Sequence, residues 1–79
     1  MTVPQLLQKS RDAHAAYRRI ADGLGDRASK RVAKVAQLRV ARDMRQKAHD
    51  LDPDHDDPAW LEDRTPHAVL MAFYAQQVD

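Results

Sequence analysis

The sequence predicts an all-α protein: an antiparallel helical hairpin of two long helices, with a short C-terminal helix packed across it. Three observations lead to this fold. Apolar residues recur every three or four positions through two long stretches. The two glycines of the chain, Gly23 and Gly25, fall between these stretches. Pro53, Pro58 and Pro66 all follow the second stretch, so that stretch is predicted to end before Pro53.

The first helix is expected over about residues 3–23. Thr2 is a favourable N-cap, Gln5 three residues later completes a capping box, and Pro4 suits the first turn. Glycine adopts the left-handed conformation without steric cost, so Gly23 and Gly25 are expected to end the helix and turn the chain.

The second helix is expected over about residues 27–50. Asp26 is a favourable N-cap, and no glycine or proline interrupts this stretch. At 100° per residue, one arc is predicted to face the core: Val32, Ala33, Ala36, Val40, Met44 and Leu51. A cationic face is predicted roughly opposite: Arg27, Lys30, Arg31, Lys34, Arg42 and Arg45.

An acidic connector is expected over residues 51–58, exposed and flexible because it holds two prolines and a run of aspartates. Asp57 and Pro58 then predict a turn or two of helix. We expect Trp60 in that turn to close the open end of the hairpin. The C-terminal helix is predicted over about residues 66–77, where Val69, Leu70, Phe73 and Tyr74 share a face.

Charge divides the 79-residue chain into two halves. Residues 1–47 carry twelve basic and four acidic side chains, a net charge of +8, whereas residues 48–79 carry one basic and eight acidic side chains, a net charge of −7. Two interpretations remain open at this point. Asp54, Asp56 and Asp57 neutralise the cationic face, within the chain or between protomers, or each half contacts a partner of its own.

Metal and catalytic motifs are weak. The alternating aspartates from Asp50 resemble the start of a calcium loop, but His55 stands where that loop needs glycine and Leu61 where it needs glutamate. Cysteine is absent and no two of the four histidines (His14, His49, His55 and His67) are four residues apart, so we expect no metal site and no cofactor. Ser29 lies among Arg27, Lys30 and Arg31 with no acid or histidine beside it, and a chain this short has little room for an enclosed active site, which predicts a non-enzymatic protein.

These observations favour a small helical interaction protein, a regulator or inhibitor that binds another protein. The alternative is a nucleic-acid-binding accessory protein that uses the cationic face of the second helix. A third hypothesis is an assembly subunit, with a homodimer formed through the wide apolar arc of the hairpin. Trp60 and Tyr74 are candidate interface anchors, although a core position is favoured for Trp60.

Composition sets the expected location. The chain is 43% hydrophobic and 32% charged, too apolar for a disordered tail and too charged for a membrane protein. No apolar stretch reaches the ~18 residues of a membrane span and no signal-peptide pattern opens the sequence, so a cytoplasmic protein is expected. The abundance of arginine and alanine suggests a G+C-rich bacterial or phage genome.

Overall fold

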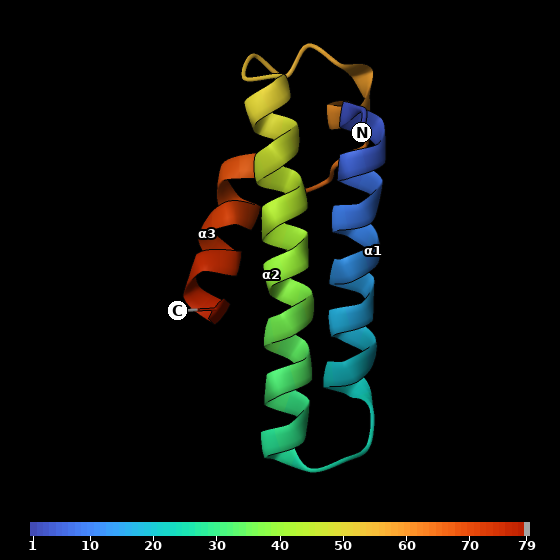
Figure 1. The fold of residues 1–79 in the computed structure, drawn as a ribbon, viewed down its shortest axis with the longest axis vertical. Coiled ribbons are helices and arrows are strands. Elements are labelled where there is room, and N and C mark those ends of the chain that lie inside the picture. Colours follow the sequence, from blue (N-terminus) through green and yellow to red (C-terminus); the bar gives the residue numbers. More distant parts are fainter. Residues whose placement is uncertain (79) are drawn as a thin grey trace.

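The computed structural model describes residues 1–78 and consists of three α-helices and one short 3-10 helix (Figure 1). The helices are α1 (Val3–Asp22), α2 (Arg27–Leu51), η1 (Pro58–Glu62) and α3 (His67–Val78). Helices α1 and α2 run antiparallel, and α3 packs along the middle of α2 in the view of Figure 1. The predicted all-α fold, a hairpin with a short C-terminal helix across it, is confirmed.

Side chains cap both ends of the hairpin turn and the start of α1. Thr2 and Gln5 form the predicted capping box, in which each side chain bonds the other residue's backbone amide. Gly23 ends α1 in an extended conformation instead of the expected left-handed one; Gly25 has the positive φ. The carbonyls of Ala21 and Gly23 instead accept hydrogen bonds from Nζ of Lys30, at 3.1 and 2.6 Å.

The hydrophobic core fills only the half of the hairpin that lies away from its turn. One buried cluster joins Leu6, Leu7, Ala48, Ala59 and Trp60. A second joins Ala13, Leu38, Ala41 and Tyr74, with α3 packed over it. None of the side chains at positions 14–37, all of which the structure describes, is fully buried. The turn end of the hairpin therefore has no core of its own.

The face of α2 that packs inward differs from the predicted one. Leu38, Ala41, Arg45 and Ala48 are buried, whereas Val32 and Val40 of the predicted core arc are 73% and 44% exposed. Small residues allow the two helix backbones to approach closely, and the Ser10 hydroxyl donates to the Ala41 carbonyl at 2.7 Å. Met44 of the predicted arc does pack against the first cluster, whereas Leu51 is 61% exposed, so the predicted arc overlaps the inward face only in part.

The acidic connector is ordered around one carboxylate. Asp52 accepts hydrogen bonds from the amides of Asp56 and Asp57 and from Nε1 of Trp60, at 3.1, 2.9 and 2.9 Å. These backbone hydrogen bonds, led by that of Asp57, lower the pKa of Asp52. Trp60 is 8% exposed and packs against the first cluster at the open end of the hairpin, as the sequence predicted. The expected flexible link is instead a folded cover.

Candidate functional site

The six predicted cations do not form one continuous face. Arg27 and Arg31 are exposed and Lys34 is half-buried, all in the turn half of α2. The ammonium group of Lys30 caps α1. Arg42 pairs with its neighbour Asp43 at 3.2 Å. Arg45 is 1% exposed, a core residue and not a surface cation.

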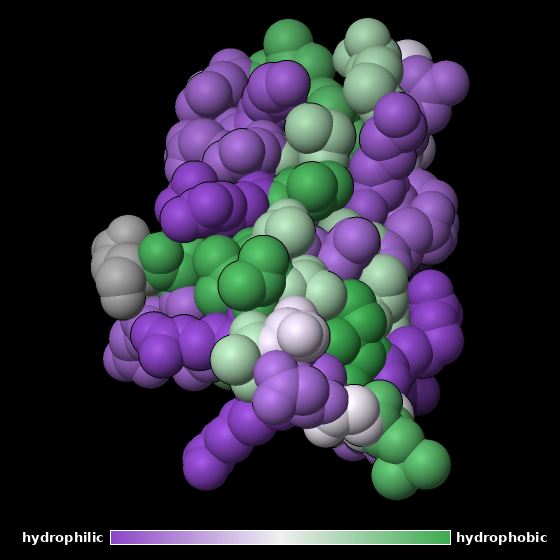
Figure 2. All heavy atoms as spheres, turned by 60° about the horizontal axis from the view of Figure 1, so that its bottom comes forward, coloured by the Kyte–Doolittle hydropathy of each residue, from purple (hydrophilic) through white to green (hydrophobic). Residues whose placement is uncertain are grey.

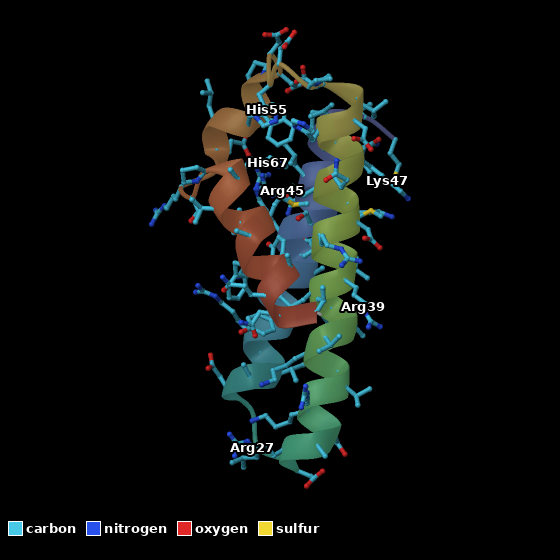
Figure 3. All side chains as sticks on the ribbon, turned by 90° about the vertical axis from the view of Figure 1, so that its left-hand side faces the viewer. Arg27, Arg39, Arg45, Lys47, His55 and His67 are labelled. Atoms are coloured by element: carbon cyan, nitrogen blue, oxygen red, sulfur yellow. The ribbon has the colours of Figure 1, made fainter. Side chains whose placement is uncertain are left out.

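Arg27, Arg31 and Lys34 border an open groove at the turn end of the hairpin. Helix α3 ends partway along the hairpin, and beyond it the turn half is uncovered on this side (Figure 3). The groove has a volume of about 730 Å³. Its lining comes from all three helices: Tyr17 from α1, Asp26, Arg27, Ala28, Arg31, Lys34, Val35 and Leu38 from the start of α2, and Gln76 and Gln77 from α3.

The groove combines an apolar floor with a cationic rim. Tyr17 and Val35 are half-buried, so part of each ring or branched side chain is in contact with solvent. The one acidic residue in the lining, Asp26, accepts a hydrogen bond from the Ser29 amide as the N-cap of α2. Figure 2 brings the hairpin turn forward and shows hydrophobic side chains reaching the surface between hydrophilic ones. This combination suits a ligand that is both apolar and anionic.

At the other end of the hairpin, a buried ion-pair network surrounds Asp63. Its carboxylate accepts from Arg45 at 2.7 Å and from Arg11 at 2.9 Å. Arg11 also donates to the carbonyl of Ala59 at 3.1 Å, which ties α1 to η1. A second guanidinium nitrogen of Arg45 lies 3.3 Å from Nδ1 of His67, and Nε of Arg45 has no hydrogen-bond partner among residues 1–78.

Three histidines meet beside this network. His49 lies in the last turn of α2, His55 lies in the connector, and His67 begins α3. Nδ1 of His49 lies 2.8 Å from Nε2 of His55. The His55 ring stacks on Trp60, with centroids 3.7 Å apart and planes 5° apart. Burial first, and then Arg45, lower the pKa of His67 to about 4, so this imidazole is neutral at pH 7.

Sequence spacing gave no signal for this cluster. His49 and His55 are six residues apart and His55 and His67 twelve, and neither interval places two ligands on one helix face. The fold of the connector around Asp52 brings the rings together. Among residues 1–78, these three are the group whose nitrogens lie close enough together to share a metal ion.

The two predicted interface anchors are buried inside the chain. Trp60 covers the end of the hairpin, and Tyr74 is 2% exposed in the second cluster. The Tyr74 hydroxyl lies 2.7 Å from Nδ1 of His14. Burial, followed by the charges of Arg18 and Arg45, lowers the pKa of His14, and burial raises that of Tyr74. Neither aromatic ring is free to anchor a partner.

No protein-family model, curated protein or solved structure matches this chain. Within residues 1–78, no helix is both long enough and apolar enough to cross a bilayer.

Proposed function

We propose that this protein is a small, non-enzymatic helical interaction module that binds an acidic, amphipathic segment of another protein in the groove between α1, α2 and the end of α3. One observation carries the proposal. The turn half of the hairpin, residues 14–37, has no fully buried side chain, yet it borders a groove with an apolar floor and three cations.

Apolar contact and charge have separate roles in this proposal. An apolar side chain of the partner would cover Tyr17 and Val35, which removes nonpolar surface from water. Carboxylates flanking it would pair with Arg27 and Arg31 and set the orientation of the segment. A protein that works this way acts by occupancy, as a regulator or inhibitor in the cytoplasm.

The groove favours an acidic protein segment over nucleic acid. Three of the six predicted cations line it, whereas Lys30, Arg42 and Arg45 are engaged with groups of the chain itself. A phosphate-tracking surface depends on many cations, because affinity grows with the number of phosphates neutralised. The apolar floor has no role in such binding. Nucleic-acid binding is therefore the alternative, and the experiment must distinguish it from binding of an acidic protein segment.

The test uses a synthetic helical peptide of leucine and glutamate with an apolar stripe every three or four residues, and a scrambled peptide of equal composition. We expect the patterned peptide to bind with an affinity at least about tenfold above that of the scrambled one. Arg31→Glu with Lys34→Glu should abolish this binding. The matched control is Arg39→Glu with Lys47→Glu, two exposed cations on the outer side of α2 (Figure 3).

Two results would contradict the proposal. One is equal loss of binding in the groove variant and the control variant, which would indicate nonspecific charge attraction. The other is absence of peptide binding together with tight, salt-dependent binding of a DNA duplex, which would favour the nucleic-acid alternative. The homodimer stays a prediction; sedimentation equilibrium of the free protein tests it, and the exposed Val32 and Val40 are the residues to substitute.

A further inference from the structure

The end of the hairpin opposite the groove holds a cluster of imidazoles with the composition of a metal site. His49, His55 and His67 come from α2, the connector and α3, and one nitrogen from each lies within 4.8 Å of the others. All three side chains are half-buried. Figure 3 shows His55 and His67 close together at this end, next to Arg45.

The distances suit ligands of one ion after small rotations. Zinc binds histidine nitrogens at about 2.0–2.1 Å, so two nitrogens on a tetrahedral ion lie roughly 3.3 Å apart. In this structure the His49 and His55 nitrogens are 2.8 Å apart, and the whole set spans at most 4.8 Å. The required spacing falls between these values. The rings of His49 and His67 are stacked at 14°, so one of them must turn for both to face the same ion.

The backbone and Trp60 hold His55 in place. His55 has a positive φ of 55°, a left-handed conformation that few residue types adopt readily. Its amide donates to the carbonyl of Asp52, and its ring lies flat on Trp60. The imidazole is therefore positioned by its surroundings before any ligand arrives, which reduces the ordering cost of binding.

The charge of Arg45, which lies beside the cluster, is offset by a carboxylate. Asp63 pairs with Arg45 at 2.7 Å. Arginine only donates, so Nδ1 of His67 accepts the Arg45 hydrogen bond and the proton of the neutral ring is on Nε2. A metal on Nδ1 takes the place of this hydrogen bond directly. A metal on Nε2 leaves the ring proton on Nδ1, which can then no longer accept from Arg45. In either case metal binding breaks the hydrogen bond between Arg45 and His67.

We propose that His49, His55 and His67 bind one divalent transition-metal ion of the Zn²⁺, Ni²⁺ or Cu²⁺ class, with a remaining position occupied by water. Neutral imidazole is a favoured ligand for these ions, and three protein ligands with one open position is a known arrangement for zinc. The ion would join the end of α2, the connector and the start of α3. It would thereby stabilise the cover over the open end of the hairpin.

The experiment uses the full chain without a polyhistidine tag, freed of metal by chelator and titrated with ZnCl₂ at pH 7.5 by calorimetry. We expect one equivalent to bind and the melting temperature to rise with zinc concentration. His49→Gln, His55→Asn and His67→Gln should each weaken binding by about tenfold or more. Asparagine is chosen at 55 because it tolerates the left-handed conformation. His14→Gln is the matched control and should bind as the parent does.

Circular dichroism establishes that each variant is folded. If a variant is not folded, the parent protein is studied instead by nitrogen NMR of its imidazole rings. Zinc should shift the ring resonances of His49, His55 and His67 and leave those of His14 unchanged. The proposal is overturned if the folded parent shows no saturable binding. It is also overturned if the three variants bind as tightly as His14→Gln does, or if zinc perturbs His14 and not the cluster.

Discussion

Arg45 is a charged residue that the fold treats as part of its core. The residue is 1% exposed, and its charge is balanced by Asp63, which follows η1 in the chain. The Trp60 ring centre is 5.7 Å from its guanidinium carbon. Nothing in the sequence near Arg45 indicates this pairing, because Asp63 lies 18 residues away along the chain.

Removing the acid of this pair should cost more than removing the base. Asp63→Asn leaves Arg45 buried with no carboxylate, and we expect a loss of about 3 kcal/mol in the free energy of unfolding. Arg45→Met fills the same space with an apolar chain and leaves Asp63 paired with Arg11, so its cost should be clearly smaller. Urea unfolding followed by circular dichroism measures both. Equal losses, or the opposite order, would show that Arg45 contributes through packing alone.

His14 should make stability fall in mild acid. It faces Arg18 on its own helix, Arg45 on α2 and the Tyr74 hydroxyl on α3, and its pKa is lowered in the folded chain. Below about pH 6.5 the unfolded chain therefore binds more protons, and stability decreases as the pH falls toward the folded pKa. His67 acts in the same direction.

The measurement is the melting temperature of the parent and of His14→Gln between pH 7.5 and pH 5. Glutamine can still accept from the Tyr74 hydroxyl, so the fold should be kept. We expect the parent to lose more stability over this range than the variant does. Parallel pH profiles would mean that His14 does not titrate differently in the folded and unfolded chains.

At the scale of the elements, local sequence signals placed the helices but not the packed face of α2. Capping by Thr2 and Asp26 and the glycines of the turn are local features, and each could be read from the chain. The inward face depends on which side of α2 meets both α1 and α3. That contact is tertiary, and Ala41 and Ala48 are buried because of it, not because of their hydropathy.

The same limit applies to the candidate sites. The sequence identifies the cations of α2 as candidate binding residues. It does not show that Arg27, Arg31 and Lys34 border a groove whereas Arg45 is buried, because this difference follows from the position of α3. The histidine cluster depends on the connector folding back over the hairpin. Composition alone predicts a flexible connector, whereas hydrogen bonds from its amides to the Asp52 carboxylate hold it in one conformation.

Close packing of α1 on α2 predicts a contrast between two alanines. Ala41 is fully buried, and its carbonyl accepts from the buried Ser10. Ala41→Leu should overfill this contact and reduce the free energy of unfolding by about 1–3 kcal/mol. Ala36→Leu, at an exposed position of the same helix, should have an effect within about 0.5 kcal/mol. The face predicted from hydropathy would require the opposite result, and chemical denaturation of the two variants decides.

Over the whole molecule, the groove cations Arg27, Arg31 and Lys34 and the acidic connector lie toward opposite ends of the hairpin. The molecule extends 42 Å along its longest axis, and the hairpin turn and the acidic connector lie at its two ends (Figure 1). From Lys30 to Asp50 along α2 is about 30 Å at 1.5 Å per residue. This distance exceeds the screening length of roughly 8 Å at physiological salt, so the connector is not expected to mask the groove cations of its own chain.

Neutralising the connector should therefore leave the groove unaffected. We expect Asp54→Asn with Asp56→Asn to bind heparin at 150 mM salt as the parent does, within about twofold. Asp57 is left intact because it caps η1. Arg27→Glu is the positive control and should weaken heparin binding. A clear gain in affinity for the aspartate variant would show that the acidic end reaches the cations of this chain or of a second copy.

Because the core is confined to one half of the hairpin, the local stability of the chain is lower at the turn end than in the other half. The helix ends near the turn can open by breaking backbone hydrogen bonds and those of the Lys30 cap, since no fully buried side chain at 14–37 is exposed by that motion. Opening the other half must expose Leu7, Leu38 and Tyr74 together. Amide hydrogens should thus exchange fastest next to Gly25 and slowest near Ala41. A partner in the groove would slow exchange at the fast end, so the molecule would complete its folding when it binds.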